Sequence, residues 1–281
     1  MLRPTRGSGI TDVHSAGAGR ILALGIGPIF SESLDGGQTW AEETPFGRKH
    51  PVRVGLTAEG NPLVGTDNAR LFERTPHGWT ETAIKGLSRV TSIARTSGAT
   101  LVAGRILVRR PLGESEWLPT AANPKKLYTT LVAAAGDLLY ASLCDTAGRS
   151  SLVRSDDHGL TWVEQPVTLP AKVESLSAWG SRAIAVVTGG QAFLTHDRGR
   201  TWTSIQLPEY GPYDLGFVAI SERAIYSLAR SAKDPSLFHS IDDGATWERG
   251  EPMPWAATMA TSPEGVIYIA NGGLVLTVSP R

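Results

Sequence analysis

Four aspartates recur in one octapeptide pattern, S/T-x-D-x-G-x-T-W, at Asp35, Asp157, Asp197 and Asp242. A carboxylate can act as a general acid or base, bind a metal ion, or accept hydrogen bonds from backbone N–H groups. Here each aspartate follows a Ser or Thr by two positions and precedes a Gly by two positions. This arrangement is typical of a tight turn, because Ser, Thr and Asp bond to nearby backbone groups and Gly accepts positive φ. We therefore predict that the four aspartates cap turns and are not catalytic.

Other side chains of catalytic types lack partners at a useful spacing. The six histidines include no H-x-H or H-x-x-x-H pair, and no Cys/His spacing is typical of a zinc site. The single cysteine, Cys144, cannot form an internal disulfide, and no neighbouring residue identifies it as a reactive thiol. No G-x-S-x-G motif marks a serine nucleophile, and no Gly-rich phosphate loop opens a helix. The sequence therefore predicts no metal ion and no cofactor.

The octapeptides belong to a repeat that runs along the whole chain. Two degenerate copies have Pro76 and Pro111 in place of the aspartate, and the terminal tryptophans of all six copies lie at positions 40, 79, 117, 162, 202 and 247. Spacings of 38 to 45 residues indicate a repeat architecture. Upstream of each octapeptide are short apolar segments separated by turns; in the third unit they are residues 90–94, 101–104 and 106–108. Such segments predict short strands, and no helical periodicity lies between them.

Four short antiparallel strands in each repeat are typical of the blade of a β-propeller. We predict one all-β domain, a seven-bladed β-propeller of four-stranded antiparallel blades, in which each octapeptide joins the third strand to the fourth. The expected blades are residues 10–45, 51–84, 88–121, 126–169, 172–208, 212–252 and 254–281. The last unit has only three strand segments, so residues 1–9 are expected to add the fourth strand and close the ring.

The four intact octapeptides resemble the Asp-box (BNR) repeat of sialidases, sortilin-type receptors and certain photosystem II assembly factors. The resemblance extends over essentially the whole chain and implies a propeller whose box turns lie on the face opposite the ligand site. It also implies a structural role for Asp35 with Trp40, Asp157 with Trp162, Asp197 with Trp202, and Asp242 with Trp247. We expect each tryptophan to fill space between adjacent blades. These families share the box and differ in function, so the resemblance predicts a fold and not an activity.

The face opposite the octapeptides is where we expect a ligand. It carries the crossovers between blades and two loops that we expect to be long, residues 143–151 and 229–237, and binding residues often gather on such loops. Basic residues beside aromatic ones suit a small anionic or carbohydrate-like ligand. The candidate ligand-binding residues are Arg53, Arg89, Arg105, Tyr128, Arg149, Tyr213, Asp214, Arg230 and Trp255.

The charge balance limits the partners. The 281 residues contain 27 Lys plus Arg and 27 Asp plus Glu, so no net field attracts the chain to nucleic acid or to an anionic membrane. No apolar run of 18 residues occurs, and the first nine residues, MLRPTRGSG, have no apolar h-region, so we expect no secretory signal. We expect a cytoplasmic monomer that binds a protein partner or a small ligand; a trimmed signal would instead indicate a secreted protein.

The leading interpretation is a non-catalytic binding scaffold that uses the face opposite the octapeptides. The alternative is an enzyme at the mouth of the central channel, either similar to glycoside hydrolases and sialidases or a lyase or cyclase. A sialidase should carry Arg-Ile-Pro before the first box, whereas residues 19–23 read GRILA. A third option, implied by the photosystem assembly factors, is an arginine patch at Arg48, Arg53, Arg89 and Arg105. An enzyme should show converging buried carboxyls or a Tyr/Glu pair, and a scaffold should show a broad surface without strongly shifted pKa values.

Overall fold

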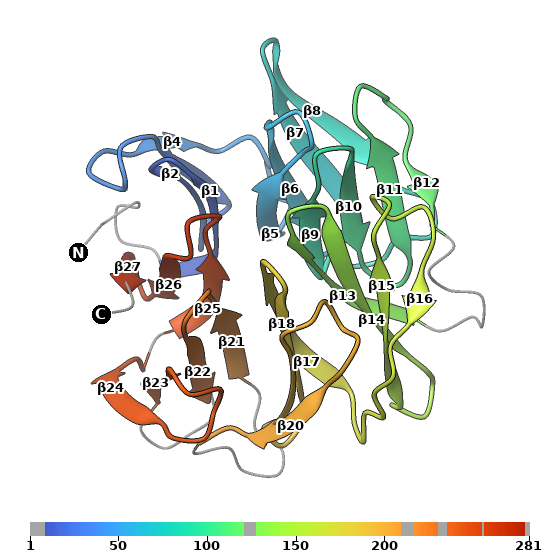
Figure 1. Cartoon of the computed structure of the whole chain (residues 1–281). Coiled ribbons are helices and arrows are strands. Elements are labelled where there is room, and N and C mark those ends of the chain that lie inside the picture. The colour runs from blue at the N-terminus through green and yellow to red at the C-terminus, as the bar shows by residue number, and fades with distance from the viewer. Residues whose placement is uncertain (1–8, 121–127, 209–215, 230–234, 255, 279–281) are drawn as a thin grey trace.

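The computed structural model describes residues 9–120, 128–208, 216–229, 235–254 and 256–278. In these ranges the chain forms β-strands and no helix, and the strands make seven sheets arranged around a ring (Figure 1). The predicted all-β seven-bladed propeller is confirmed. Six sheets contain four strands each, and the last contains three strands among the described residues.

The strands of the first four blades have the following bounds. They are β1 Ile10–Gly17, β2 Arg20–Gly25, β3 Ile29–Ser33 and β4 Ala41–Glu43; β5 Pro51–Leu56, β6 Pro62–Thr66, β7 Arg70–Thr75 and β8 Gly78–Ala83; β9 Ser92–Arg95, β10 Ala99–Ala103, β11 Leu107–Pro111 and β12 Leu118–Pro119; and β13 Tyr128–Ala135, β14 Leu138–Cys144, β15 Ser150–Ser155 and β16 Val163–Glu164.

The last three blades follow in the same way. Their strands are β17 Val173–Trp179, β18 Arg182–Val187, β19 Gln191–Thr195 and β20 Thr203–Gln206; β21 Gly216–Ile220, β22 Ile225–Ala229, β23 Ser236–Ser240 and β24 Glu248–Pro252; and β25 Ala256–Thr261, β26 Ile267–Asn271 and β27 Leu274–Val278.

Within each sheet the strands pair antiparallel in chain order. The first strand of each blade lies innermost, and the innermost strands contact one another around the ring, including β1 with β25. Residue 9 is the first that the structure describes, so the predicted closure of the last blade by residues 1–9 lies almost wholly outside the described residues. The described closure is the contact of the first blade with the last.

The hydrophobic core is divided among the seams between blades. Trp40 packs on a cluster that joins Ile21 of the first blade to Tyr268 of the last, and Trp162 packs on one that joins Leu101 to Leu139. The other repeat tryptophans, Trp79, Trp117, Trp202 and Trp247, also pack at seams. Each repeat tryptophan therefore attaches its blade to the preceding one, as expected for a large apolar ring at the outer strand.

Each of the four octapeptides forms the same hydrogen-bonded turn. In the first, Ser33 Oγ donates to Asp35 Oδ1 (2.8 Å), Gly37 N donates to Ser33 Oγ (2.7 Å), and Thr39 Oγ1 donates to Asp35 Oδ2 (2.6 Å). The turns at Asp157, Asp197 and Asp242 repeat these bonds. In the first turn, the bonds from Thr39 lower the pKa of Asp35 to about 2. Each of these carboxylates is therefore engaged by hydrogen bonds within its own turn.

The octapeptide turns and the turns between the first and second strands lie at one end of the ring, here named the octapeptide face. The turns between the second and third strands and the connections between blades lie at the other end, the crossover face. This follows from the antiparallel order of each sheet, in which successive turns alternate between the two ends.

One predicted loop is wrong. We expected a long irregular loop at residues 143–151 containing Cys144, but Cys144 is the buried last residue of β14 and pairs with Ser150 of β15. Only residues 145–149 form the turn, in which Asp145 Oδ1 accepts hydrogen bonds from the backbone N–H groups of Ala147 and Arg149. The ladder continues through polar residues because backbone pairing does not require apolar side chains. Of the second loop, residues 230–234 lie outside the described part of the chain.

Candidate functional site

Three cavities follow one another along the axis of the ring. The crossover cavity, of about 800 Å³, opens on the crossover face, and the octapeptide-face cavity, of about 710 Å³, opens at the other end. A narrower channel of about 240 Å³ shares lining residues with both, Arg53 with the first and His14 with the second. The volumes of the crossover cavity and of the octapeptide-face cavity both fall within the range of roughly 300 to 1,000 Å³ that is usual for ligand sites.

The crossover cavity brings together four of the predicted ligand-binding residues. Arg53 belongs to β5, Arg89 to the connection before β9, Arg105 to the turn between β10 and β11, and Tyr128 begins β13. They come from three successive blades and are separated by up to 75 positions in the sequence. All four line the same cavity.

A repeated irregularity of the innermost strands shapes this mouth. The register of β5 with β6 shifts between Pro51 and Arg53. Equivalent shifts occur near the starts of β1, β13, β17 and β25. A bulge adds one residue and bends the strand locally. Successive residues such as Thr130 and Leu131 of β13 therefore both line the cavity.

Arg53 is anchored at the base of the crossover cavity by backbone oxygens. Its Nε donates to the carbonyl of Thr91 (2.7 Å) and one terminal nitrogen donates to the carbonyl of Val52 (2.7 Å). Burial raises the pKa of the nearby Asp12, and the positive charge of Arg53 acts on that pKa in the opposite direction. The described residues form no ion pair with Arg53, so its charge is positioned without being neutralised by direct contact.

The rim of the cavity is basic and partly aromatic. The guanidinium carbon of Arg105 lies 5.1 Å from the ring centroid of Tyr128, a cation–π contact that orients the side chain. Lys172 pairs with Glu174 at 3.2 Å, and Phe217 supplies a second aromatic wall. Arg89 and Arg105 are exposed and have no ion pair among the described residues.

The charge balance of this mouth differs from that of the whole chain. The described lining contains four basic side chains, those of Arg53, Arg89, Arg105 and Lys172, and one acidic side chain, that of Glu174. An excess of cationic groups around a recess attracts anions and raises their local concentration. The arrangement can therefore hold a carboxylate or phosphate by bidentate hydrogen bonds from arginine.

Other predicted residues do not gather here. Arg149 is exposed in the turn after β14, where its Nε donates to Asp145 Oδ2 (2.8 Å), and it does not line the crossover cavity. Arg48 likewise is not among the lining residues. Four candidates, Tyr213, Asp214, Arg230 and Trp255, lie outside the described residues.

The channel holds one carboxyl that sequence reasoning missed. Asp12 of β1 is buried, and its Oδ2 accepts a hydrogen bond from Val54 N (2.8 Å). Burial raises the pKa of Asp12 to about 6, against the lowering effect of Arg53 and of several hydrogen bonds. Asp12 is the third residue of β1 and belongs to no recognisable motif, so the sequence alone gives no sign that it is buried.

The signatures expected of an enzyme are met only in part. Asp12 and Glu174 are the acidic residues among the described lining of the channel, and they come from β1 and β17. Their carboxyls share no hydrogen bond, and the described part of the chain contains no Tyr–Glu hydrogen bond. The raised pKa of Asp12 departs from the unperturbed surface expected of a scaffold. No three His, Cys, Asp or Glu of the described residues lie close enough to hold a metal ion.

The comparisons with known proteins identify the fold. No protein-family model and no curated protein matches the sequence. A catalytically inactive variant of virginiamycin B lyase from Staphylococcus aureus, solved with quinupristin, superposes with a TM-score of 0.77 and 12% identity over 98% of this chain and 96% of that one. YCF48 bound to D1 peptide superposes with a TM-score of 0.70 and 14% identity, over 100% and 94% of the two chains. The WD40 propeller domain of Doa1 superposes with a TM-score of 0.75 and 10% identity, over 100% and 96%.

The shared property is the β-propeller fold. At 10 to 14% identity, these neighbours show nothing further about this chain. They include a lyase and a protein solved with a bound peptide, so the shared fold does not distinguish between these two classes of function. Among the described residues, no helix is long and apolar enough to span a membrane.

Proposed function

We propose that the protein is a non-catalytic scaffold of the Asp-box type that binds an acidic segment of a protein partner in the crossover cavity. The observation that carries the proposal is the convergence of Arg53, Arg89 and Arg105, from the second and third blades, on one cavity, without an ion pair to any described carboxylate. Cationic groups gathered around one recess attract an anion into the space between them.

The depth and the rim favour a peptide carboxylate. Arg53 sits at the base, held by two carbonyls, and Arg89 and Arg105 stand exposed at the entrance, so an acidic segment would meet charges at two levels. Tyr128 and Phe217 offer flat apolar surface to the intervening side chains. YCF48, which shares the fold, has been solved with a peptide bound, and this supports the use of such a propeller for peptide binding.

One observation favours an enzyme as the second candidate. The carboxyl of Asp12, with its pKa raised to about 6 by burial, is suited to exchange a proton near neutral pH. It lies in the channel directly below the crossover cavity and within the field of Arg53. A lyase acting on an anionic substrate at this mouth would use Asp12, whereas a scaffold would not need it.

The test measures binding of an acidic peptide. A fluorescein-labelled peptide of alternating Asp and Ser is titrated with the protein in fluorescence anisotropy, at about 50 and about 300 mM salt. The same peptide with Asn in place of Asp is the neutral comparison. We expect the acidic peptide to bind more tightly, and each of Arg89→Ala and Arg105→Ala to raise its Kd roughly fivefold, the effect of about 1 kcal/mol for a rim charge.

Arg223→Ala is the matched control, because Arg223 is an exposed arginine on the octapeptide face and does not line the crossover cavity. Equal affinity for the acidic and neutral peptides would refute the proposal. So would a set of variants in which Arg223→Ala weakens binding as much as Arg89→Ala. Asp12→Asn distinguishes the second candidate, since it should leave peptide affinity nearly unchanged and abolish a proton-transfer activity.

A further inference from the structure

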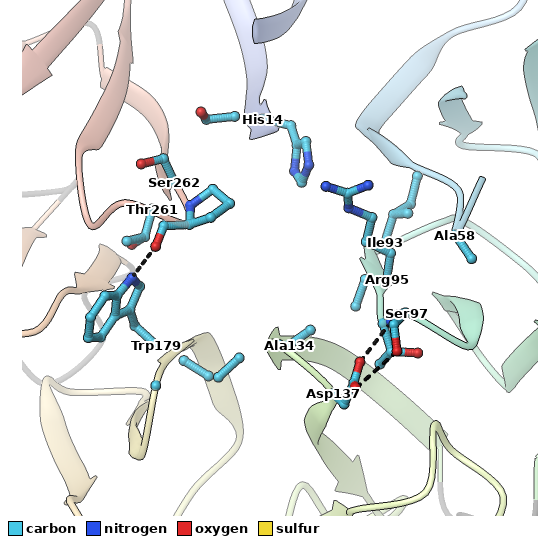
Figure 2. Close-up of a pocket in the computed structure, with 18 residues that line it drawn as sticks. His14, Ala58, Ile93, Arg95, Ser97, Ala134, Asp137, Trp179, Thr261 and Ser262 are labelled. Atoms are coloured by element: carbon cyan, nitrogen blue, oxygen red, sulfur yellow. Dashed lines mark hydrogen bonds between the residues drawn. The ribbon is translucent and has the colours of Figure 1, made fainter. Parts of the chain in front are cut away.

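The octapeptide-face cavity shares no described lining residue with the crossover cavity, in which the site proposed above lies. It is lined from six blades, mostly by small or apolar groups such as Ala58, Ile93, Ala134 and Ala178, with the indole of Trp179 on one side (Figure 2). The Trp179 Nε1 donates to the carbonyl of Pro263 (3.1 Å), which fixes the ring in the wall. Small side chains leave the space open, and the hydrogen-bonded wall makes it a preformed recess.

Arg95 brings a charge into this recess. It is the last residue of β9, half-buried, and it forms no hydrogen bond or ion pair with any described residue. Burial, followed by the nearby charge of Arg20, lowers the pKa of Arg95. Its guanidinium offers five N–H donors, and none of them has an acceptor in the part of the chain that the structure describes.

His14 stands beside Arg95. Figure 2 shows its imidazole and the Arg95 guanidinium pointing toward one another at the edge of the cavity. Burial, followed by the charges of Arg95 and Arg20, lowers the pKa of His14 to about 4, so the ring is neutral at neutral pH. A neutral imidazole still has one N–H to donate.

The carboxylates of this face are used elsewhere. Asp137 accepts hydrogen bonds from Ser97 N (2.7 Å) and Ser97 Oγ (3.0 Å), as the dashed lines in Figure 2 show. Glu264 accepts one from Ala18 N (3.0 Å), and Glu32 pairs with Arg20 (2.8 Å). None of these carboxylates neutralises Arg95.

We propose that the octapeptide-face cavity is a second binding site, which takes a small organic carboxylate with an apolar or aromatic body. The Arg95 guanidinium binds the carboxylate by two parallel hydrogen bonds, and the His14 imidazole adds a third donor. The body of the ligand lies against Trp179 and the alanines of the wall. An apolar wall with few polar groups gathered at one edge is the usual composition of a small-molecule site.

The test uses isothermal titration calorimetry with 1-naphthylacetate and its neutral amide, 1-naphthylacetamide. We expect the carboxylate to bind with a Kd of about 0.1 to 1 mM, as its size allows, and the amide at least about tenfold more weakly. Arg95→Gln should weaken the carboxylate at least about tenfold. Ala134→Leu, which fills the recess without altering a charge, should weaken both compounds.

Arg105→Ala is the matched control, because it removes a charge from the crossover cavity alone and should change the Kd by less than about twofold. The proposal is overturned by equal affinity for the two compounds, or by unchanged carboxylate binding in Arg95→Gln. It is also overturned if Arg105→Ala weakens binding as much as Arg95→Gln, since the probe would then occupy the crossover cavity. If circular dichroism shows that Arg95→Gln does not fold, the Ala134→Leu variant decides the question. Unchanged affinity of this variant for the carboxylate would then overturn the proposal.

Discussion

Asp12→Asn should stabilise the protein at neutral pH, although it removes a charge that lies near Arg53. The wild-type carboxyl is buried and accepts a hydrogen bond from Val54 N, and burial raises its pKa from 3.8 to about 6. Asparagine keeps an oxygen acceptor for Val54 and stays neutral at every pH. The substitution therefore resembles the protonated acid and avoids burying an ionised one.

The size of the effect follows from linkage between protonation and folding. Below pH 3.8 both the folded and the unfolded chains hold the proton, and between pH 3.8 and about 6 only the folded chain holds it. Stability that is fully present at low pH is thus lost as the pH rises through this window. A rise in pKa from 3.8 to about 6 corresponds to roughly 3 kcal/mol, lost by the wild type and not by Asp12→Asn.

The measurement is urea denaturation of both proteins, followed by tryptophan fluorescence, at pH values from about 4 to about 8. The free energy of unfolding of Asp12→Asn minus that of the wild type should grow by up to about 3 kcal/mol across this range. Asp197→Asn is the control, because hydrogen bonds from Thr201 hold the pKa of Asp197 at about 2, below the range measured. Its difference from the wild type should stay constant. A flat profile for Asp12→Asn would refute a buried, proton-holding Asp12.

The remaining predictions concern the seams and the octapeptide turns. A methyl group on Gly65 would lie 2.5 Å from Cγ1 of the fully buried Val90, so Gly65→Ala should lower the free energy of unfolding by about 1 to 3 kcal/mol. Urea denaturation measures this change, and an unchanged midpoint would show that the neighbouring side chains move aside without cost. Arg198 holds φ at 62° in its octapeptide turn, so Arg198→Gly should raise stability by up to about 1 kcal/mol in thermal denaturation. Arg198→Ala retains the strain and should show no such gain.

The fold could be predicted because its signals are local. Each octapeptide contains the Ser or Thr, the Asp and the Gly that close one turn, and the spacing of the tryptophans sets the length of each blade. The bonds of Asp35 span two to four residues, which explains why sequence alone identified the turn. The error at Cys144 arose where the composition turned polar while backbone pairing continued, because composition does not record the ladder.

The candidate sites depended on the tertiary structure. The sequence singled out Arg53, Arg89, Arg105 and Tyr128 as separate candidates on one face, and only the ring shows that they line one cavity. Sequence reasoning missed His14 and Arg95, which lie on different blades and meet only after the ring closes. A propeller places equivalent positions of successive blades side by side although about 40 residues separate them in the chain. The sequence by itself thus determined the repeat, the turns and the number of blades, and the folded ring decided which charges converge.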